Sequence, residues 1–251
     1  MAIPAAPPRT MLNPILNPRS PICKAVADDG DVAIKIKYVG AQPSYTITVS
    51  AAGDITLKHG VASSEAVDSS VGVAGVFDVS TFDTFAKIID NINGSANWKA
   101  YLVDVLRTDS ADASTGSLLA LSEARGAKNS TMSLYKDTSK VLNLSARIGS
   151  RAGVIGSEEV SAAEIYQIAS LSTFGSGTNK IQVYEIDEIA KTETKIYETA
   201  GGATTVANEK TFVVNGRGGL ATSKTGTHLL VRMIGSAALT GTLSVLGATA
   251  K

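Results

Sequence analysis

Residues 45–58 read YTITVSAAGDITLK, and this stretch decides the fold class of the chain. Apolar and polar residues alternate over 45–50 and again over 54–58, and the link between the two runs contains Gly53. Alternation of this kind is typical of a strand with one buried face, and two such runs joined by a short glycine-containing loop predict a β-hairpin. We therefore expect a mainly β chain with minor α structure.

The segments around this hairpin predict a small α+β module within residues 31–155. An alternating run precedes the hairpin at 32–39 and places every second residue nearer one face, namely Val32, Ile34, Ile36 and Tyr38. Residues 98–106, which read WKAYLVDVL, predict a strand on the other side. Between them, residues 80–93 have the spacing of an amphipathic helix. The expected apolar face of this helix consists of Phe82, Phe85, Ile88, Ile89 and Ile92.

The ends of this helix carry recognisable signals. Ser80 is a suitable N-cap, and Asp83 stands three residues later in the position of the acidic partner of a capping box. Gly94 follows the last apolar residue and is a suitable C′ residue. The module is thus expected to have the order hairpin, helix and strand, with the helix covering a small sheet.

The second half of the chain predicts a different architecture. Short runs at 118–121, 132–135 and 141–148 could be strands or turns, and we place the domain boundary at 155/156, within a glycine-containing stretch. Residues 156–251 predict a C-terminal β-sandwich or jelly-roll-like domain, because short strands recur at regular spacing with Gly and Asn turns. The candidate strands are Ile165–Phe174, which also fits helical spacing, Lys180–Ile189, Thr194–Thr199, Lys210–Val214, His228–Ile234 and Thr242–Leu246.

The N-terminal segment, residues 1–30, predicts an extended arm. All seven prolines lie in the first 43 residues, and proline fixes φ and removes a backbone donor, so residues 1–24 are poorly suited to regular strands or helices. The arm is nevertheless rich in large apolar side chains, which a solvated tail does not need. A disordered tail is one interpretation, and an arm that orders against a neighbouring subunit is the other. The anchors expected in the second case are Met11, Leu12, Ile15, Leu16 and Ile22.

Composition narrows the class of function. The chain of 251 residues is 44% hydrophobic and 18% charged, with 23 basic and 23 acidic residues and a formal net charge of zero. A balanced chain lacks the positive surplus that drives non-specific nucleic-acid binding. The near-zero charge also weakens the self-repulsion that opposes assembly. The sequence contains neither a secretory signal nor a long apolar run, so we expect no membrane partner and synthesis in the cytoplasm.

The titratable residues do not form a recognisable catalytic or metal-binding motif. A structural zinc site would need Cys23, His59, His228 and a carboxylate together, although these residues are far apart in sequence. The acidic cluster Asp28–Asp31 lacks the ligand spacing of a calcium loop, and the same holds for Asp109 and Asp112. We expect turns at these positions, no cofactor and no metal.

Three further motifs are interpreted as structural. The glycine-rich segments 175–180 and 216–219 do not lead into a helix, which a phosphate-binding loop requires, so both predict turns. Ser133–Lys136 matches S-x-x-K and Lys224–Gly226 matches K-T-G, the order found in penicillin-binding enzymes. That site needs its serine at the start of a buried helix, and the surroundings here are polar. We therefore do not expect an enzyme.

Residues 75–93, GVFDVSTFDTFAKIIDNIN, carry a resemblance to known proteins. This segment resembles the strand-to-helix unit ending in Ile-Asn that recurs in flagellin and hook-associated proteins and in many phage structural proteins. In style the whole chain resembles tailed-bacteriophage virion proteins, with a proline-rich arm followed by β domains rich in small residues. Flagellins themselves differ, because their long terminal coiled-coil helices have no counterpart here. The resemblance implies a virion component and transfers no catalytic residues.

We accordingly expect a structural subunit of a phage particle that is assembled in the host cytoplasm. The first candidate is a capsid decoration or cement protein that clamps neighbouring copies of the major capsid protein and forms a homo-oligomer, with a trimer favoured. The alternatives are a tail, neck or fibre-associated virion protein, or a carbohydrate-binding attachment module in the C-terminal half. Sugar sites usually present aromatic platforms, and this half has few: Tyr166, Phe174, Tyr184, Tyr197 and Phe212.

Deletion of residues 2–24 should leave a folded protein that no longer joins the particle. The reason is that the apolar anchors of the arm would supply binding energy to a neighbour rather than to their own fold. Circular dichroism and thermal unfolding would check the fold, and electrophoresis of purified particles would check incorporation. Normal incorporation of the deletion variant would contradict the arm hypothesis.

Overall fold

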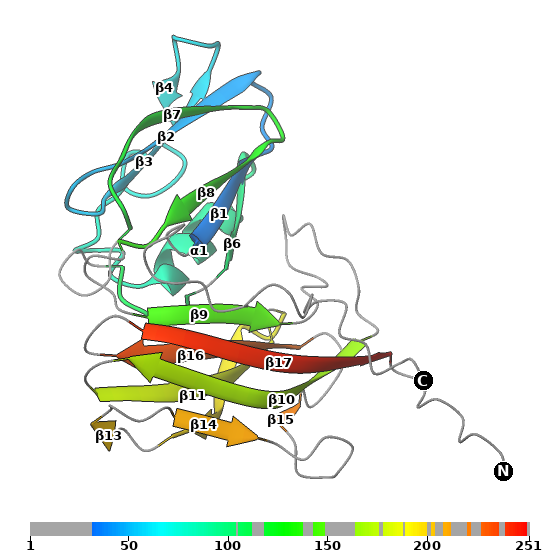
Figure 1. Ribbon diagram of the computed structural model, residues 1–251. Helices are drawn as coiled ribbons and strands as arrows, with labels where there is room; N and C mark the ends of the chain where they lie inside the picture. The colour runs from blue at the N-terminus through cyan, green and yellow to red at the C-terminus, as the bar shows by residue number, and fades with distance from the viewer. Residues whose placement is uncertain are drawn as a thin grey trace, which may run out of the picture. The chain divides into compact units, whose positions relative to one another are not determined.

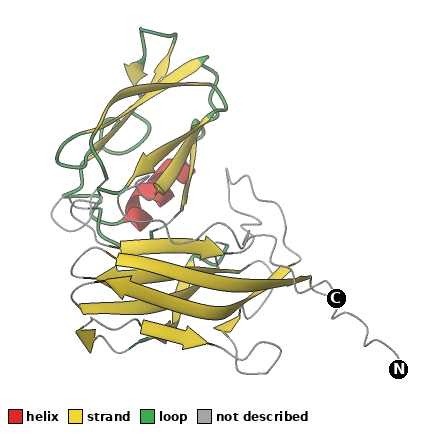
Figure 2. Cartoon of the chain, viewed as in Figure 1, coloured by secondary structure: helices red, strands yellow, loops and turns green. Residues whose placement is uncertain are grey.

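The structure of the protein is a computed structural model (Figure 1). It describes residues 32–103, 105–111, 118–137, 143–148, 164–175, 178–187, 189–199, 202–203, 208–211, 220–221, 227–235 and 239–249. The described residues fall into two compact units, one before residue 138 and one after residue 142. Each is mainly β, as the sequence predicts, and the single described helix lies in the N-terminal unit (Figure 2).

The first sheet of the N-terminal unit is antiparallel and has the order β6-β1-β8. Its strands are β1 (Val32–Tyr38), β6 (Trp98–Leu102) and β8 (Thr131–Tyr135). Ile34 is fully buried, and the lysines that alternate with the buried residues of β1 are not, which confirms the predicted alternation there. The register of β1 and β8 shifts between Val32 and Ile34, so the pattern does not extend to the first residue.

The predicted hairpin is confirmed and belongs to a second antiparallel sheet. It is formed by β2 (Ser44–Val49) and β3 (Ile55–Gly60), which pair in continuous register from one end to the other. β7 (Leu121–Ala127) pairs with the other edge of β2. The short strands β4 (Ala66–Val67) and β5 (Val76–Phe77) pair with β3. The hairpin and β6 therefore lie in different sheets, whereas the sequence suggested one small sheet.

The helix α1 spans Phe85–Gly94 and is shorter than predicted. Ser80 is not its N-cap: the N-cap residue is Thr84, whose side chain makes no capping hydrogen bond. The first helical N–H groups are instead satisfied by a neighbouring loop, because Phe85 N–H donates to the carbonyl of Asp109 and Ala86 N–H donates to that of Arg107. Backbone carbonyls thus replace the capping box that the sequence predicts.

The segment before the helix and the end of the helix also differ from the prediction. Ser80 lies in a turn in which its N–H donates to the carboxylate of Asp78 at 2.8 Å. At the other end Gly94 is the last helical residue, and Ser95 is the C-cap in extended conformation. The side chain of Asn93 then bonds to both the N–H and the carbonyl of Ala100, at 2.8 Å each, and so attaches the helix end to β6.

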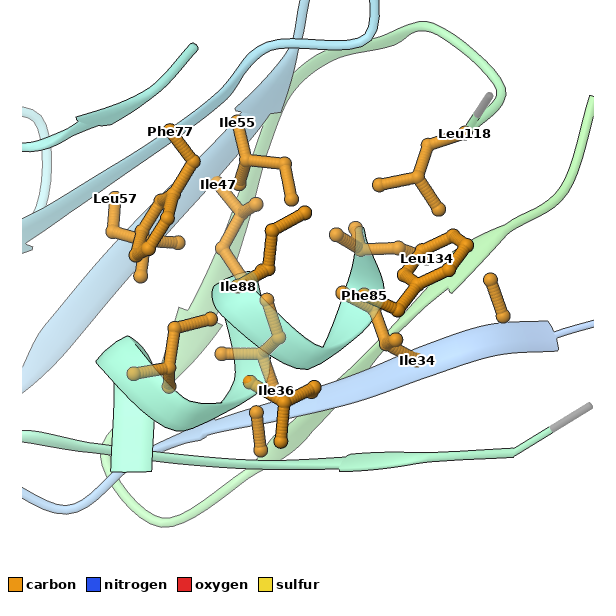
Figure 3. Close-up of a cluster of buried hydrophobic side chains, with 14 of the residues drawn as sticks. Ile34, Ile36, Ile47, Ile55, Leu57, Phe77, Phe85, Ile88, Leu118 and Leu134 are labelled. Carbon is orange, nitrogen blue, oxygen red and sulfur yellow. The ribbon is translucent and has the colours of Figure 1, made fainter. Parts of the chain in front are cut away.

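One hydrophobic core joins the two sheets and the helix of the N-terminal unit (Figure 3). The helix contributes Phe85, Ile88 and Ile92, all of which are 0–1% exposed. Phe82, which the sequence places on the same helical face, lies outside the helix and is only partly buried against the core. The strands contribute the other large members, which include Ile34, Ile36, Ile47, Ile55, Leu57, Phe77, Trp98 and Leu134.

The first sheet of the C-terminal unit has the order β12-β11-β16-β9 and is antiparallel. Its strands are β9 (Asn143–Ile148), β11 (Thr178–Asp187), β12 (Thr192–Glu198) and β16 (His228–Gly235), and β13 (Gly202–Ala203) also pairs with β11. The strands β11 and β12 form an antiparallel hairpin in which Asp187 pairs directly with Thr192.

The second sheet of this unit is built around β10 (Glu164–Gly175). This segment is a strand, which settles the choice between helix and strand that the sequence left open. One edge of β10 pairs with β17 (Leu239–Thr249), and its other neighbours are β14 (Asn208–Thr211) and β15 (Leu220–Ala221). All of these pairings are antiparallel.

β9 lies before residue 156, where the sequence analysis begins the C-terminal domain, yet it pairs with β16. The C-terminal unit therefore includes a strand that the sequence analysis assigned to the α+β module. A six-residue run contains no information about which distant strand it will pair with, so its sheet could not be predicted from its own residues.

Replacement of Ile88 by alanine should destabilise the N-terminal unit by about 2–5 kcal/mol, because it empties a fully buried site where the helix meets the sheets. The matched control is Lys87→Ala one position away, where a half-exposed ion pair with Asp83 should contribute less than about 1 kcal/mol. Urea unfolding followed by tryptophan fluorescence would measure both, since the single Trp98 lies in the same core. Equal effects of the two substitutions would contradict this description of the core.

Candidate functional site

The sequence-predicted interface residues lie outside the described part of the chain. This holds for Met11, Leu12, Ile15, Leu16 and Ile22, and equally for Cys23 and for the acidic cluster at 28–31. The arm therefore stays a prediction. Among the described residues, no group of three or more His, Cys, Asp or Glu side chains is arranged to hold a metal ion.

The S-x-x-K motif lies on a strand and not at the start of a helix. Ser133 is in the middle of β8, and Lys136 follows the end of this strand in a bridge with Leu118. Residues three apart on a strand point to opposite faces, so this pair does not have the geometry that the enzyme motif requires. The K-T-G segment, Lys224–Gly226, lies outside the described residues.

Two other candidate groups have structural roles in the described residues. The glycine-rich segment at 175–180 joins the end of β10 to the start of β11, so it leads into a strand as expected. The carboxylate of Asp109 accepts a hydrogen bond from Leu106 N–H at 2.8 Å and closes a turn. The segment at 216–219 and Asp112 lie outside the described residues.

Exposed apolar side chains gather in a segment that the sequence analysis did not single out. We call residues 61–75 the valine loop, which runs from the end of β3 to the start of β5 and contains β4. Val61, Val67 and Val73 are 62%, 44% and 64% exposed. Because these are three of the six large apolar residues that are exposed in the described residues, the loop is the strongest candidate for a contact surface.

The backbone of the valine loop has an unusual local conformation. Gly72 and Gly75 have positive φ, and so does Ala74 at 51°, a value that L-residues with a side chain rarely adopt. A Cβ on Gly72 would meet the Val76 carbonyl oxygen at 2.4 Å, and one on Gly75 would meet Val67 at 2.0 Å. Both glycines are therefore required, and the strain at Ala74 persists only because the surrounding contacts enforce it.

The carboxylate of Asp68 attaches the loop to both sheets of the N-terminal unit. Its Oδ1 accepts hydrogen bonds from Ser70 N–H at 2.9 Å and from the Ser70 hydroxyl at 2.6 Å. Its Oδ2 accepts from Asn97 Nδ2 at 3.0 Å and from Trp98 Nε1 at 2.9 Å, and it lies 3.1 Å from His59 Nε2. Trp98 belongs to β6 and His59 to β3, so one carboxylate links strands of different sheets.

This hydrogen bonding determines the protonation of Asp68. Burial of the carboxylate, which is only 5% exposed, would by itself raise its pKa. The donors from Ser70, Asn97 and Trp98 outweigh that effect and lower the pKa of Asp68 to about 2. Asp68 is therefore ionised at neutral pH and is held as a structural anion.

A second carboxylate holds the other end of the loop. Glu65 accepts two hydrogen bonds from the Arg125 guanidinium on β7, at 2.6 and 3.1 Å, and a third from the Ser44 hydroxyl on β2 at 2.8 Å. The hydrogen bonds from Arg125, which outweigh the effect of desolvation, lower the pKa of Glu65 to about 2. The same pair raises the pKa of Arg125. Such a bidentate pair fixes orientation as well as position.

The middle of the loop is fixed by the core and by the helix. Val71 is fully buried in the core cluster, and Gly72 N–H donates to the side-chain oxygen of Asn91 on α1 at 2.8 Å. Two backbone hydrogen bonds join the loop to Leu57 of β3. Asp68 N–H donates to the Leu57 carbonyl, and Leu57 N–H donates to the Gly75 carbonyl. The loop is thus attached to β2, β3, β6, β7 and α1, while three of its four valines, Val61, Val67 and Val73, are exposed.

His59 packs within an aromatic cluster at the join of the two sheets. Its ring stacks on Tyr38 with centroids 5.2 Å apart, and Tyr38 contacts Trp98 edge-on at 4.9 Å. The Nδ1 atom of His59 is buried and has no hydrogen-bond partner among the described residues. A catalytic histidine needs one nitrogen free to reach a reacting group. Here Nε2 lies 3.1 Å from the Asp68 carboxylate and Nδ1 is buried, so the arrangement serves packing.

The sequence contained one signal for this site. Residues 71–76 read VGVAGV, and glycines at this spacing among valines indicate a tight non-helical turn that displays apolar side chains. The carboxylates could not be recognised in advance, because their donors Asn97, Trp98 and Arg125 lie 29 to 60 residues away in the sequence.

The described residues contain no helix that is long and apolar enough to span a membrane. No protein-family model matches the chain, and no curated protein matches it.

Replacement of Asp68 by asparagine should destabilise the protein at neutral pH by about 2–3 kcal/mol, since it removes a buried hydrogen-bonded anion. The folded pKa of about 2 lies below the ordinary value of 3.8, so the stabilisation is present above about pH 4 and is lost as the pH falls through about 2. The wild type should therefore lose about 2 kcal/mol of unfolding free energy from this group on acidification, and the variant should lose less.

Urea unfolding at pH 7 and pH 3 would measure both effects, and about 1 kcal/mol of the wild-type loss should be present at pH 3. The control is Asp78→Asn, an exposed carboxylate that bonds only to Ser80 within its own turn, with an expected change below about 1 kcal/mol. An Asp68→Asn protein that is as stable as the wild type at pH 7 would show that this carboxylate does not hold the loop.

Proposed function

We propose that the chain is a structural subunit that is built into a larger protein assembly, and that this assembly is the virion of a tailed bacteriophage. Within the particle we propose a capsid decoration or cement role, with the major capsid protein as partner. The observation that carries the proposal is the valine loop, an exposed apolar segment that is held rigid by buried hydrogen bonds and ion pairs. The phage assignment itself is supported only by the resemblance of residues 75–93 and by the style of the chain.

The energetics of the valine loop suit a permanent contact. Full burial of a valine side chain contributes on the order of 1.5–3 kcal/mol, so Val61, Val67 and Val73 together could supply several kcal/mol of binding free energy. Binding usually loses part of this gain to the ordering of flexible segments. The loop is already ordered by Glu65, Asp68 and Val71, so this cost is small.

The protonation of the two carboxylates supports a role without catalysis. A general acid or base works best when its pKa is close to the working pH. The pKa values of Glu65 and Asp68 are both about 2, and each carboxylate is occupied by hydrogen-bond donors from its own chain. The two carboxylates hold a backbone segment in place. Both are deprotonated at neutral pH, so neither has a proton to transfer.

For the C-terminal unit we propose a β-sandwich. β10 contacts β11 and β16, and β17 contacts β9 and β16, so strands of one sheet lie against strands of the other. Ile181, Val183 and Val231 are buried on paired strands of one sheet, as expected for an inner face. In the proposed particle this unit is presented outward.

Val67→Asp and Val73→Asp together should weaken binding to capsids that lack the subunit by at least about tenfold, because the contact would then bury charges. Cosedimentation of the purified full-length protein with such capsids would measure the affinity. The control is Ile189→Asp on the β11–β12 connection, which introduces one aspartate at a residue that is 72% exposed. Unchanged binding of the double variant, with the fold intact by circular dichroism, would remove the valine loop from the proposed interface.

A further inference from the structure

β17 is the longest edge strand in the described part of the chain. It spans eleven residues, Leu239–Thr249, and pairs with β10 from Thr249 at one end to Leu239 at the other. No described strand pairs with its opposite edge. An edge of this kind presents a row of backbone N–H and C=O groups that can pair with another strand.

The other long edge strands of the protein carry features that discourage such pairing. β7 contains Glu123 and Arg125, and β12 contains Glu193, Lys195 and Glu198. Both strands are also irregular. In the pairing of β7 with β2, the step from Ile47 to Val49 of β2 is matched by three residues of β7, so β7 has one extra residue. In the pairing of β12 with β11, β12 likewise has one extra residue. Charges and bulges on an edge are the usual protection against unwanted pairing.

β17 has neither form of protection. Its sequence, LTGTLSVLGAT, contains no charged residue. Its register with β10 shifts once, between Ile168 and Ser170, and the extra residue is Ala169 of β10. β17 itself is continuous across this point, since Val245 and Ser244 are consecutive. Among the described strands, β17 is therefore the long edge strand that is both regular and uncharged.

We propose that β17 pairs antiparallel with β17 of a second copy of this chain about a two-fold axis. An unpaired strand edge is satisfied by another strand, so the partner is a main-chain segment. Among the described strands of more than six residues, β17 is the only one without a charged residue, so a second β17 brings no charge to the new pairing. The proline-rich arm is a poor donor, because proline lacks the required N–H group.

The size of the contact is sufficient for a specific dimer. Pairing over the eleven residues of β17 would form roughly ten backbone hydrogen bonds, which is the number found in a typical protein interface. A two-fold arrangement also closes on itself, so it uses up both edges and does not continue into a filament. The net charge of zero adds no long-range repulsion between the copies. This inference goes beyond the proposed function and does not depend on the nature of the particle.

The first test is the oligomeric state of the full-length protein in analytical ultracentrifugation. The wild type should contain a dimer, and Thr242→Lys with Ser244→Lys should raise its dissociation constant by about tenfold or more. These two residues share one face near the middle of the strand, so the two copies would bring four lysines together. The matched control is Thr192→Lys with Thr194→Lys on the already charged edge β12, which should leave the dimer unchanged.

A rescue experiment separates a lost contact from a damaged fold. Thr242→Glu with Ser244→Glu should also raise the dissociation constant by about tenfold or more, and a mixture of the lysine and glutamate variants should form a mixed dimer. A wild-type monomer would overturn the proposal, and so would an oligomer that the lysine pair does not affect.

Cross-linking supplies a readout that does not depend on added charge. In a Cys23→Ser background, Ser244→Cys should cross-link between copies with a short thiol-reactive reagent, and Thr192→Cys on β12 should not. Equal cross-linking at the two positions would overturn the proposed pairing.

Discussion

One carboxylate connects the two sheets of the N-terminal unit. Asp68 directly follows β4, accepts a hydrogen bond from Trp98 on β6 and lies 3.1 Å from His59 Nε2 on β3. The edge-on and stacked contacts of Tyr38 with both of these rings pack at the same place. A buried anion is tolerated only when its donors are in position, and these donors are in position only when both sheets are formed. The valine loop is therefore held in place only when the two sheets of the N-terminal unit have formed.

Charged side chains take part in contacts within this protein and are absent from the surfaces that are proposed to bind other molecules. Glu65, whose side chain is only 3% exposed, is paired within the chain with Arg125. Charge is absent where contact with another molecule is proposed, namely on the three exposed valines and along β17. A chain with only 18% charged residues can therefore combine ion pairs within the chain with uncharged surfaces for contact with other molecules. This combination suits the proposed assembly subunit.

The sequence predicted most of the strands and few of the long-range relations between them. The hairpin β2–β3 and the strands β10, β11, β12 and β16 follow from period-two alternation, a local signal. The sequence predicts the start of α1 at the wrong residue, because Ser80 and Asp83 have the spacing of a capping box. The first N–H groups of the helix instead donate to the backbone carbonyls of Arg107 and Asp109. The valine loop was also not predicted, because its conformation depends on hydrogen bonds to Asp68 and Glu65 from residues that are distant in the sequence.

The pairing of β10 with β17 has a consequence for how the molecule is made. During synthesis β10 leaves the ribosome long before β17 does, and the strands β11, β12 and β16 all lie between them in the chain. Contacts between residues so far apart in sequence form slowly and only after the intervening segment has been translated. One flank of β10 must therefore stay uncovered while its neighbours are made. The described strands of the N-terminal unit all end by residue 135, so this unit can form before the C-terminal unit is fully translated.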